Sequence, residues 1–127
     1  MHRRCAGPIG IGQKVIVRET LPNGVKLIAQ EMTGFRSVSM AVWIQAGSVY
    51  ETGAESGISH FIEHMVFKGT ESRSASDIAA EMDAVGGSIN AYTAKECTCF
   101  YAKTVDQDLP LAMDILADIF LPSRLDE

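Results

Sequence analysis

The chain has 127 residues, a net charge of −5 and a hydrophobic content of 46%. This length supports one compact unit with a modest core, no apolar run is long enough to span a membrane, and the negative charge argues against nucleic-acid binding. The basic start, Met1 to Cys5, lacks a following hydrophobic segment, so we predict no signal peptide and expect a cytoplasmic protein without a membrane partner.

The first part of the chain predicts a leader and two strands. Residues 1–12 are rich in glycine and are expected to form a flexible leader, so the folded domain is expected over residues 13–127. Asn23-Gly24 is typical of a turn and leads into a strand at about residues 25–32. In the next segment, residues 38–44, apolar side chains alternate with small or polar ones, which predicts a second strand with one apolar face.

A helix is expected after the loop of residues 46–56, with Ser56 as its N-cap. At about 100° per residue, His64 lies ~40° and Glu63 ~60° from His60 around the helix, so the three side chains project together. The opposite side is expected to be buried because it is apolar. Its residues are Ile58, Phe61, Ile62, Met65 and Val66.

His60, Glu63 and His64 form a face that could bind a metal ion. Two neutral imidazoles at positions i and i+4 commonly hold zinc, and a neighbouring carboxylate can accept a proton from water at the metal. The alternative is a helix with two partly exposed histidines and a glutamate in a salt bridge. Two of the three histidines in the chain lie in this segment, which favours the metal site.

The second half of the chain predicts two helices and two strands. Ser74 and Asp77 resemble a capping box, and the helix that they begin ends at Gly86. Its buried stripe is expected to contain Ile78, Met82 and Val85. Residues 88–93 and 96–104 are then expected to form an antiparallel pair of strands.

The last helix is expected to begin near Asp106 or Asp108, to tolerate Pro110 in its first turn and to end before Pro122. Its apolar stripe is expected to contain Leu109, Met113, Leu116 and Phe120. The resulting order, ββ-αα-ββ-α, predicts an α+β fold with helices packed on one side of a mainly antiparallel sheet.

Cys97 and Cys99 lie two residues apart and would share one face of a strand. A metal or redox site is one interpretation, but packing of a sheet face is the more common use of such a pair. Three cysteines cannot form a closed set of disulfides, which fits a reducing compartment.

Three stretches resemble one family. His60 to His64 has the order H-x-x-E-H of the inverzincins, the reverse of the thermolysin-type motif. The flanking residues 57–59 and 65–70, and the later run Gly86 to Thr93, resemble the pitrilysin or insulinase (M16-type) zinc peptidases. The resemblance covers about residues 20–127, is strongest to bacterial processing proteases and implies a LuxS/processing-peptidase-like half-domain.

The resemblance implies Zn²⁺ as the cofactor, His60 and His64 as metal ligands and Glu63 as the general base. It also implies a third ligand, a glutamate on a later helix, which we expect beyond Glu127. The chain would then be the N-terminal part of an M16 N-terminal domain, cut before the third ligand. The carboxylates of this chain that do not match that ligand are Glu51, Glu55, Glu71, Glu81, Asp83 and Glu96.

Asn90 and Ala91 resemble the substrate-binding strand of the family. If that strand is a sheet edge, its free backbone groups could pair with an extended peptide or unfolded protein substrate. The alternative from the residues alone is an interior strand with Asn90 on the surface. The remainder of the enzyme or a paired subunit is the other expected partner.

The expected function is that of a zinc-dependent endopeptidase, represented here by an N-terminal fragment. One alternative is a non-catalytic partner subunit of the same family, although such subunits usually lose residues of the H-x-x-E-H motif. Another is an inert, truncated product. Zinc content that depends on His60 would separate the enzyme from the non-catalytic subunit.

Overall fold

The structure is a computed structural model, and it describes residues 15–120. The expected leader of residues 1–12 and the expected helix end at Pro122 lie outside this range. The described residues form two compact units, one up to Phe35 and one from Arg36 onward. No helix within the described range is long and apolar enough to cross a membrane.

The first unit is a β-hairpin. Strand β1 (Ile16–Thr20) pairs in antiparallel orientation with β2 (Lys26–Gln30). The predicted turn is confirmed: Gly24 has a φ of 89°, and the Asn23 side chain accepts a hydrogen bond from the Val25 N–H at 3.2 Å. Strand β1 was not predicted, although an Asn-Gly turn normally joins two strands.

The second unit is built on a three-stranded antiparallel sheet in the order β3 (Ser37–Ile44), β5 (Thr98–Val105), β4 (Ser88–Thr93). The register places Val42, Phe100 and Ala91 in one row across the sheet. The adjacent row, on the opposite face, contains Trp43, Cys99 and Tyr92. Within the described residues β4 is therefore an edge strand.

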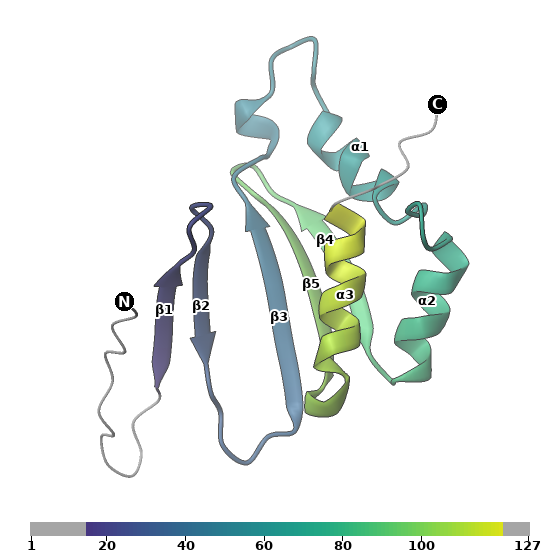
Figure 1. The fold of residues 1–127 in the computed structure, drawn as a ribbon. Helices are drawn as coiled ribbons and strands as arrows, with labels where there is room; N and C mark the ends of the chain where they lie inside the picture. The colour runs from purple at the N-terminus through teal and green to yellow at the C-terminus, as the bar shows by residue number, and fades with distance from the viewer. Residues whose placement is uncertain (1–14, 121–127) are drawn as a thin grey trace. The chain divides into compact units, whose positions relative to one another are not determined.

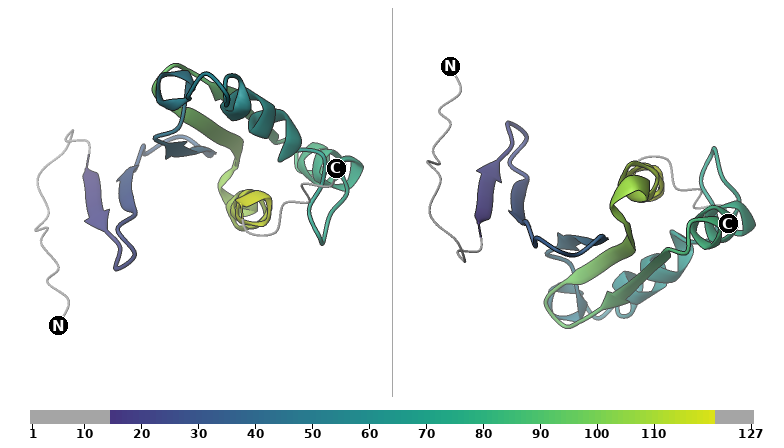
Figure 2. Two further views of the ribbon diagram at one scale, coloured as in Figure 1. Left: turned by 90° about the horizontal axis from the view of Figure 1, so that it is seen from above. Right: turned by 90° about the horizontal axis from the view of Figure 1, so that it is seen from below.

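Three helices accompany this sheet: α1 (Ile58–Met65), α2 (Ala75–Ala84) and α3 (Leu109–Phe120). Helix α3 packs along β5, and α1 and α2 pack against β4 (Figures 1 and 2). Short 3₁₀ turns, Ser48–Tyr50 and Asp106–Asp108, precede α1 and α3. The predicted α+β class is confirmed, with every strand pair antiparallel in the described range.

One hydrophobic core joins the helices to the sheet face that carries Ala91 and Phe100. Both residues are almost inaccessible to solvent, and Phe100 also packs edge-to-face against Phe120 with ring centroids 5.0 Å apart. The buried members of this core are Val66, Ile78, Met82, Ala91, Phe100, Ala102, Ala112, Ile115, Leu116 and Ile119. The core thus fixes α2, α3 and the residue that follows α1 on one face of the sheet.

Helix α2 follows its sequence prediction. The Ser74 hydroxyl accepts a hydrogen bond from the Asp77 N–H at 3.2 Å, and the Asp77 carboxylate accepts one from the Ser74 N–H at 2.9 Å. Ile78 and Met82 are buried, and Gly86 follows the helix with a φ of 62°. The capping box and the C-terminal glycine therefore determine both ends of α2.

The predicted stripe of α3 was wrong at Met113, whereas Leu116 is buried as predicted. Pro110 lies in the first turn as expected, but the buried side chains include Ile115 and Ile119, while Met113 is 56% exposed. Because α3 is apolar around most of its circumference, hydrophobicity alone does not fix its orientation. The polar residues Asp114 and Asp118 do, since both bind Arg73.

Candidate metal centre

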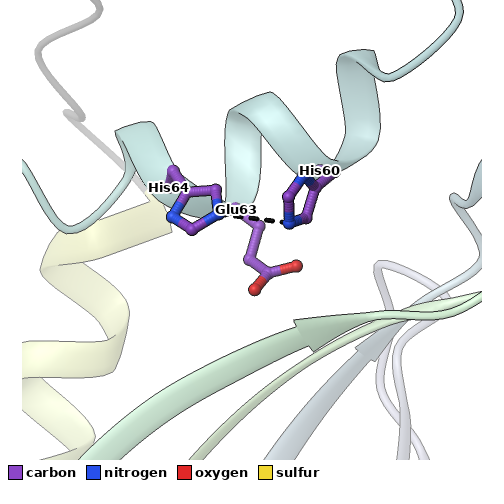
Figure 3. A group of neighbouring side chains, drawn as sticks. All are labelled: His60, Glu63 and His64. Atoms are coloured by element: carbon purple, nitrogen blue, oxygen red, sulfur yellow. Dashed lines mark hydrogen bonds between the residues drawn. The ribbon is translucent and has the colours of Figure 1, made fainter.

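The side chains of His60, Glu63 and His64 converge on one side of α1, the side that faces the strands in Figure 3. The Nε2 atoms of His60 and His64 lie 3.1 Å apart, and the two rings are nearly perpendicular. One ligand atom from each of the three residues lies within 4.8 Å of the others. Both histidines are exposed, whereas Glu63 is half-buried.

This geometry fits a metal ion. Two nitrogens that each lie ~2.0–2.1 Å from one tetrahedral zinc ion are separated by roughly 3.3 Å, close to the separation of the two imidazoles. The Oε2 atom of Glu63 is buried and has no hydrogen-bond partner within residues 15–120. A buried carboxylate oxygen without a partner is costly unless a proton donor or a cation occupies the adjacent space.

The metal-competent group is confined to α1. Across residues 15–120, His60, Glu63 and His64 are the one group of at least three His, Cys, Asp or Glu residues that is close enough to share an ion. Two of the other carboxylates have partners of their own: Glu51 binds backbone N–H groups, and Glu81 binds Arg73. Neither is available as a third ligand without losing those contacts.

The start of α1 differs from its prediction. Ser56 does not cap the helix, because the N-cap is Gly57, which has a φ of 90° and no side chain. Glu51 supplies the missing acceptor: its two oxygens accept the Gly57 N–H at 2.7 Å and the Ser59 N–H at 2.9 Å. These backbone donors hold the pKa of Glu51 below its usual value.

The apolar side of α1 is also not buried as predicted. Ile58, Phe61 and Ile62 are 46%, 60% and 40% exposed, and no residue of α1 itself is buried. The helix packs on β4, where the Thr93 hydroxyl donates to the Ser59 carbonyl at 3.5 Å, and Glu63 is half-buried while both histidines stay exposed. Val66, which directly follows α1, is the one residue of the predicted apolar side that is buried in the core.

Beyond the C-terminal end of α1, a polar network holds the chain. The Arg73 guanidinium binds Glu81 at 3.1 Å, Asp114 at 2.6 Å and Asp118 at 3.0 Å. Asp118 also accepts a hydrogen bond from the buried Thr70 hydroxyl at 2.7 Å. Together these contacts tie the segment after α1 to both α2 and α3.

The hydrogen bonds to Asp118 also change its acidity. The Ser72 hydroxyl, at 2.7 Å, contributes most to lowering the pKa of Asp118, and Thr70 and Arg73 lower it further. Asp118 is therefore stabilised as a carboxylate in the folded protein.

The predicted substrate-strand residues lie on β4, next to α1. Ala91 is buried on the core face, and Asn90 is exposed on the other face. The Ala91 N–H donates to the Asn90 side chain at 2.8 Å. The edge position required for peptide pairing is present within the described sheet.

A hollow of about 420 Å³ lies beside His60. It is bounded by the loop before α1, including Ser48 and Glu51, and by the residues after β4, including Thr93 and Lys95. The sequence analysis did not predict this hollow, because its walls come from segments about 40 residues apart.

The two central cysteines pack as the structural interpretation expected. Both Cys97 and Cys99 are free, and Cys99 is buried in the row with Trp43 and Tyr92. Burial raises the pKa of the Cys99 thiol. A neutral, buried thiol is suited to packing rather than to metal or redox chemistry.

A family model described as Insulinase (Peptidase family M16) matches residues 26–127. The chain belongs to this peptidase family. The match covers the helix with the H-x-x-E-H residues and the strand with Asn90 and Ala91, which were the basis of the resemblance seen in the sequence.

Individual relatives agree with this assignment. An uncharacterized zinc protease of Streptomyces coelicolor is 46% identical over 95% of this chain and 26% of its own length. Core protein I of the mitochondrial ubiquinol-cytochrome-c reductase complex of Euglena gracilis is 45% identical over 87% of this chain and 22% of its own. The chain thus spans about a quarter of the length of these insulinase-family proteins.

The fold agrees as well. The crystal structure of a protease from Helicobacter pylori superposes with a TM-score of 0.84 and 26% identity, covering 90% of this chain and 28% of that one. The order of helices and strands seen here is therefore also found in a solved protease.

Proposed function

We propose that this chain carries the metal-binding half-site of a zinc-dependent endopeptidase. The observation that supports this most directly is the convergence of two imidazole Nε2 atoms, 3.1 Å apart, beside a buried carboxylate oxygen without a partner. Zinc is the metal named for a relative that is 46% identical. His60 and His64 would bind the ion as neutral imidazoles.

The proposed reaction is the hydrolysis of a peptide bond. When bound, zinc supplies Lewis acidity and lowers the pKa of water at the site. Glu63 would accept a proton from that water as it attacks the peptide carbonyl, and would then deliver it to the leaving amine. The half-buried position of Glu63 beside both histidines supports this role.

The proposed substrate is an extended peptide or an unfolded protein that pairs with β4. As an edge strand, β4 offers backbone groups that can bind peptides of many sequences. A substrate carbonyl could replace the Asn90 side chain as the acceptor for the Ala91 N–H, which would free the Asn90 amide to bind the substrate as well. Asn90 and Ala91 are thus proposed as substrate-binding residues.

Two further elements belong to the proposal. Residues 13–127 would form the N-terminal part of a peptidase domain, and a glutamate from outside the described residues would complete the three protein ligands. The insulinase family also includes subunits of larger assemblies, such as the Euglena core protein, so a paired subunit is the second proposed partner.

Replacing Glu63 with Gln tests the role of the base. The amide keeps the size of the side chain but cannot accept the proton, so peptide hydrolysis should fall by about 10²–10⁴-fold. Zinc binding should persist because both imidazoles remain. Glu71→Gln, which removes one exposed carboxylate outside the group, is the matched control and should leave both properties unchanged.

Two outcomes would count against the proposal. Hydrolysis by the Glu63→Gln variant at the parent rate would remove Glu63 from the reaction. Zinc bound stoichiometrically, with no hydrolysis of any peptide by the parent protein, would favour one of the two alternatives, a non-catalytic subunit or an inert, truncated product.

A further inference from the structure

Helix α1 lacks the packing that usually orients a helix. None of its eight residues is buried, and its apolar side is exposed. Helix α3, by contrast, buries four side chains in the core. Since no side chain within α1 is buried, its direction and rotation depend on contacts at its ends, of which the buried Val66 after its last residue is one.

At the N-terminal end the contact comes from outside the helix. The first N–H groups of a helix have no partner within it and are normally bound by the N-cap side chain. Gly57 has no side chain to offer, and both oxygens of Glu51 bind backbone N–H groups there instead. One of these donors is Ser59, the residue immediately before His60. The negative charge of Glu51 also interacts favourably with the N-terminal end of the helix dipole.

Glu51 is itself held against the sheet. It directly follows the 3₁₀ turn Ser48–Tyr50, whose Val49 N–H donates to the Lys95 carbonyl at 2.9 Å. Gly47 lies so close to the turn between β4 and β5 that a Cβ atom there would clash with the Ala94 carbonyl oxygen. A continuous set of contacts therefore leads from the end of β4 through Glu51 to the first turn of α1.

We propose that Glu51 is a positioning residue for the metal centre. By fixing the first turn of α1 to the end of β4, it holds His60 and Glu63 on the side of the helix that faces the substrate strand. It does not touch the metal or the reacting atoms. This inference rests on the proposed function, because it concerns the zinc site on α1.

The test compares Glu51→Ala and Glu51→Gln with Glu55→Ala, a control in the same loop whose carboxylate binds Thr52 locally. The probe is zinc alone, in competition with a chromophoric chelator. A protein that binds metal in only a fraction of its conformations loses affinity by that fraction. We expect Glu51→Ala to weaken zinc binding about fivefold, as for loss of a helix cap. Glu51→Gln keeps one acceptor oxygen, so its zinc affinity should lie between those of the parent and Glu51→Ala. The zinc affinity of Glu55→Ala should match that of the parent.

Hydrogen exchange in the metal-free protein gives a second readout, independent of zinc. The amides of residues 60–65 should exchange faster in Glu51→Ala than in the parent, whereas amides in α3 and in the Glu55→Ala control should not change. Faster exchange in α1 alone supports the proposal even if the parent binds no zinc. In that case the proposed function, rather than the role of Glu51, would have failed.

Two results would overturn the proposal. One is a Glu51→Ala variant whose zinc affinity and α1 exchange both equal those of the parent. The other is a lower global unfolding midpoint for Glu51→Ala with unchanged zinc affinity and a uniform increase in exchange. That pattern would make Glu51 a general stabilising residue.

Discussion

Helices α1 and α3 both carry apolar side chains but have different roles in the molecule. Helix α3 buries Ala112, Ile115, Leu116 and Ile119 against the sheet, so it contributes directly to the core. Helix α1 buries none of its residues, and its polar side lies toward β4. The comparison shows that the helix with the candidate site contributes little to the core on which the rest of the unit depends.

The two helices are also held in different ways. Contact with Glu51 at one end, and the Arg73 network beyond the other end, place α1 through hydrogen bonds and charge. Hydrophobic packing places α3, and the same Arg73 network selects its rotation. Substitutions in the two helices should therefore affect different properties, which the following predictions use.

The largest effect on stability is expected from Ile115→Ala. Ile115 is fully buried in the centre of α3, so truncation leaves a cavity in the core. The free energy of unfolding should fall by about 2–5 kcal/mol. Denaturant titration measures this, and a loss below about 1 kcal/mol would show that the core does not depend on α3.

Arg73→Ala should cause the next largest loss of unfolding free energy after Ile115→Ala. The Arg73 side chain is 17% exposed and binds three carboxylates, so its removal leaves Asp118 half-buried without a cation. The expected loss of unfolding free energy is about 3 kcal/mol. Arg36→Ala is the control, because the Arg36–Asp106 pair is 75% and 54% exposed and should contribute below ~0.5 kcal/mol. Equal losses for the two variants would contradict the role given to the network.

Acid should weaken the same network. Since the pKa of Asp118 is lower in the folded than in the unfolded protein, its contribution to stability is complete above its unfolded value, near ~4. That contribution is lost as the pH falls through the lower folded value. Unfolding free energies measured from pH 6 to pH 3 should fall less steeply for Asp118→Asn than for the parent. Parallel curves would exclude Asp118 as a source of the acid sensitivity.

The smallest effect is expected on the exposed side of α1. Phe61 is 60% exposed, so Phe61→Ala should change the unfolding free energy by less than ~0.5 kcal/mol, in contrast to Ile115→Ala. The same denaturant titration provides the measurement. A loss above about 2 kcal/mol would show that this side of α1 is packed in the folded protein.

Local signals in the sequence predicted much of the fold. The capping box of α2 and the Asn-Gly turn each involve residues that are adjacent or three apart, and the alternation in β4 repeats every second residue. The helix with His60, Glu63 and His64 was predicted for the same reason, because its spacing alone brings the three side chains together.

Apart from β1, the features that were missed depend on residues outside the local pattern. Glu51 caps α1 from six residues before Gly57, and the rotation of α3 depends on Arg73, about 40 residues earlier in the chain. The burial expected for the apolar side of α1 assumed that an amphipathic helix turns its hydrophobic side inward, whereas α1 turns its polar side toward β4. No short-range pattern contains this information.

The central claim is that the polar side of α1 binds zinc, and the most direct measurement is the zinc content of purified variants. The parent and Glu63→Gln should each hold one zinc per chain, and His60→Ala and His64→Ala should lose it. His2→Ala, which replaces the one histidine outside the H-x-x-E-H motif, should retain the zinc. Stoichiometric zinc in His60→Ala and His64→Ala would contradict the claim.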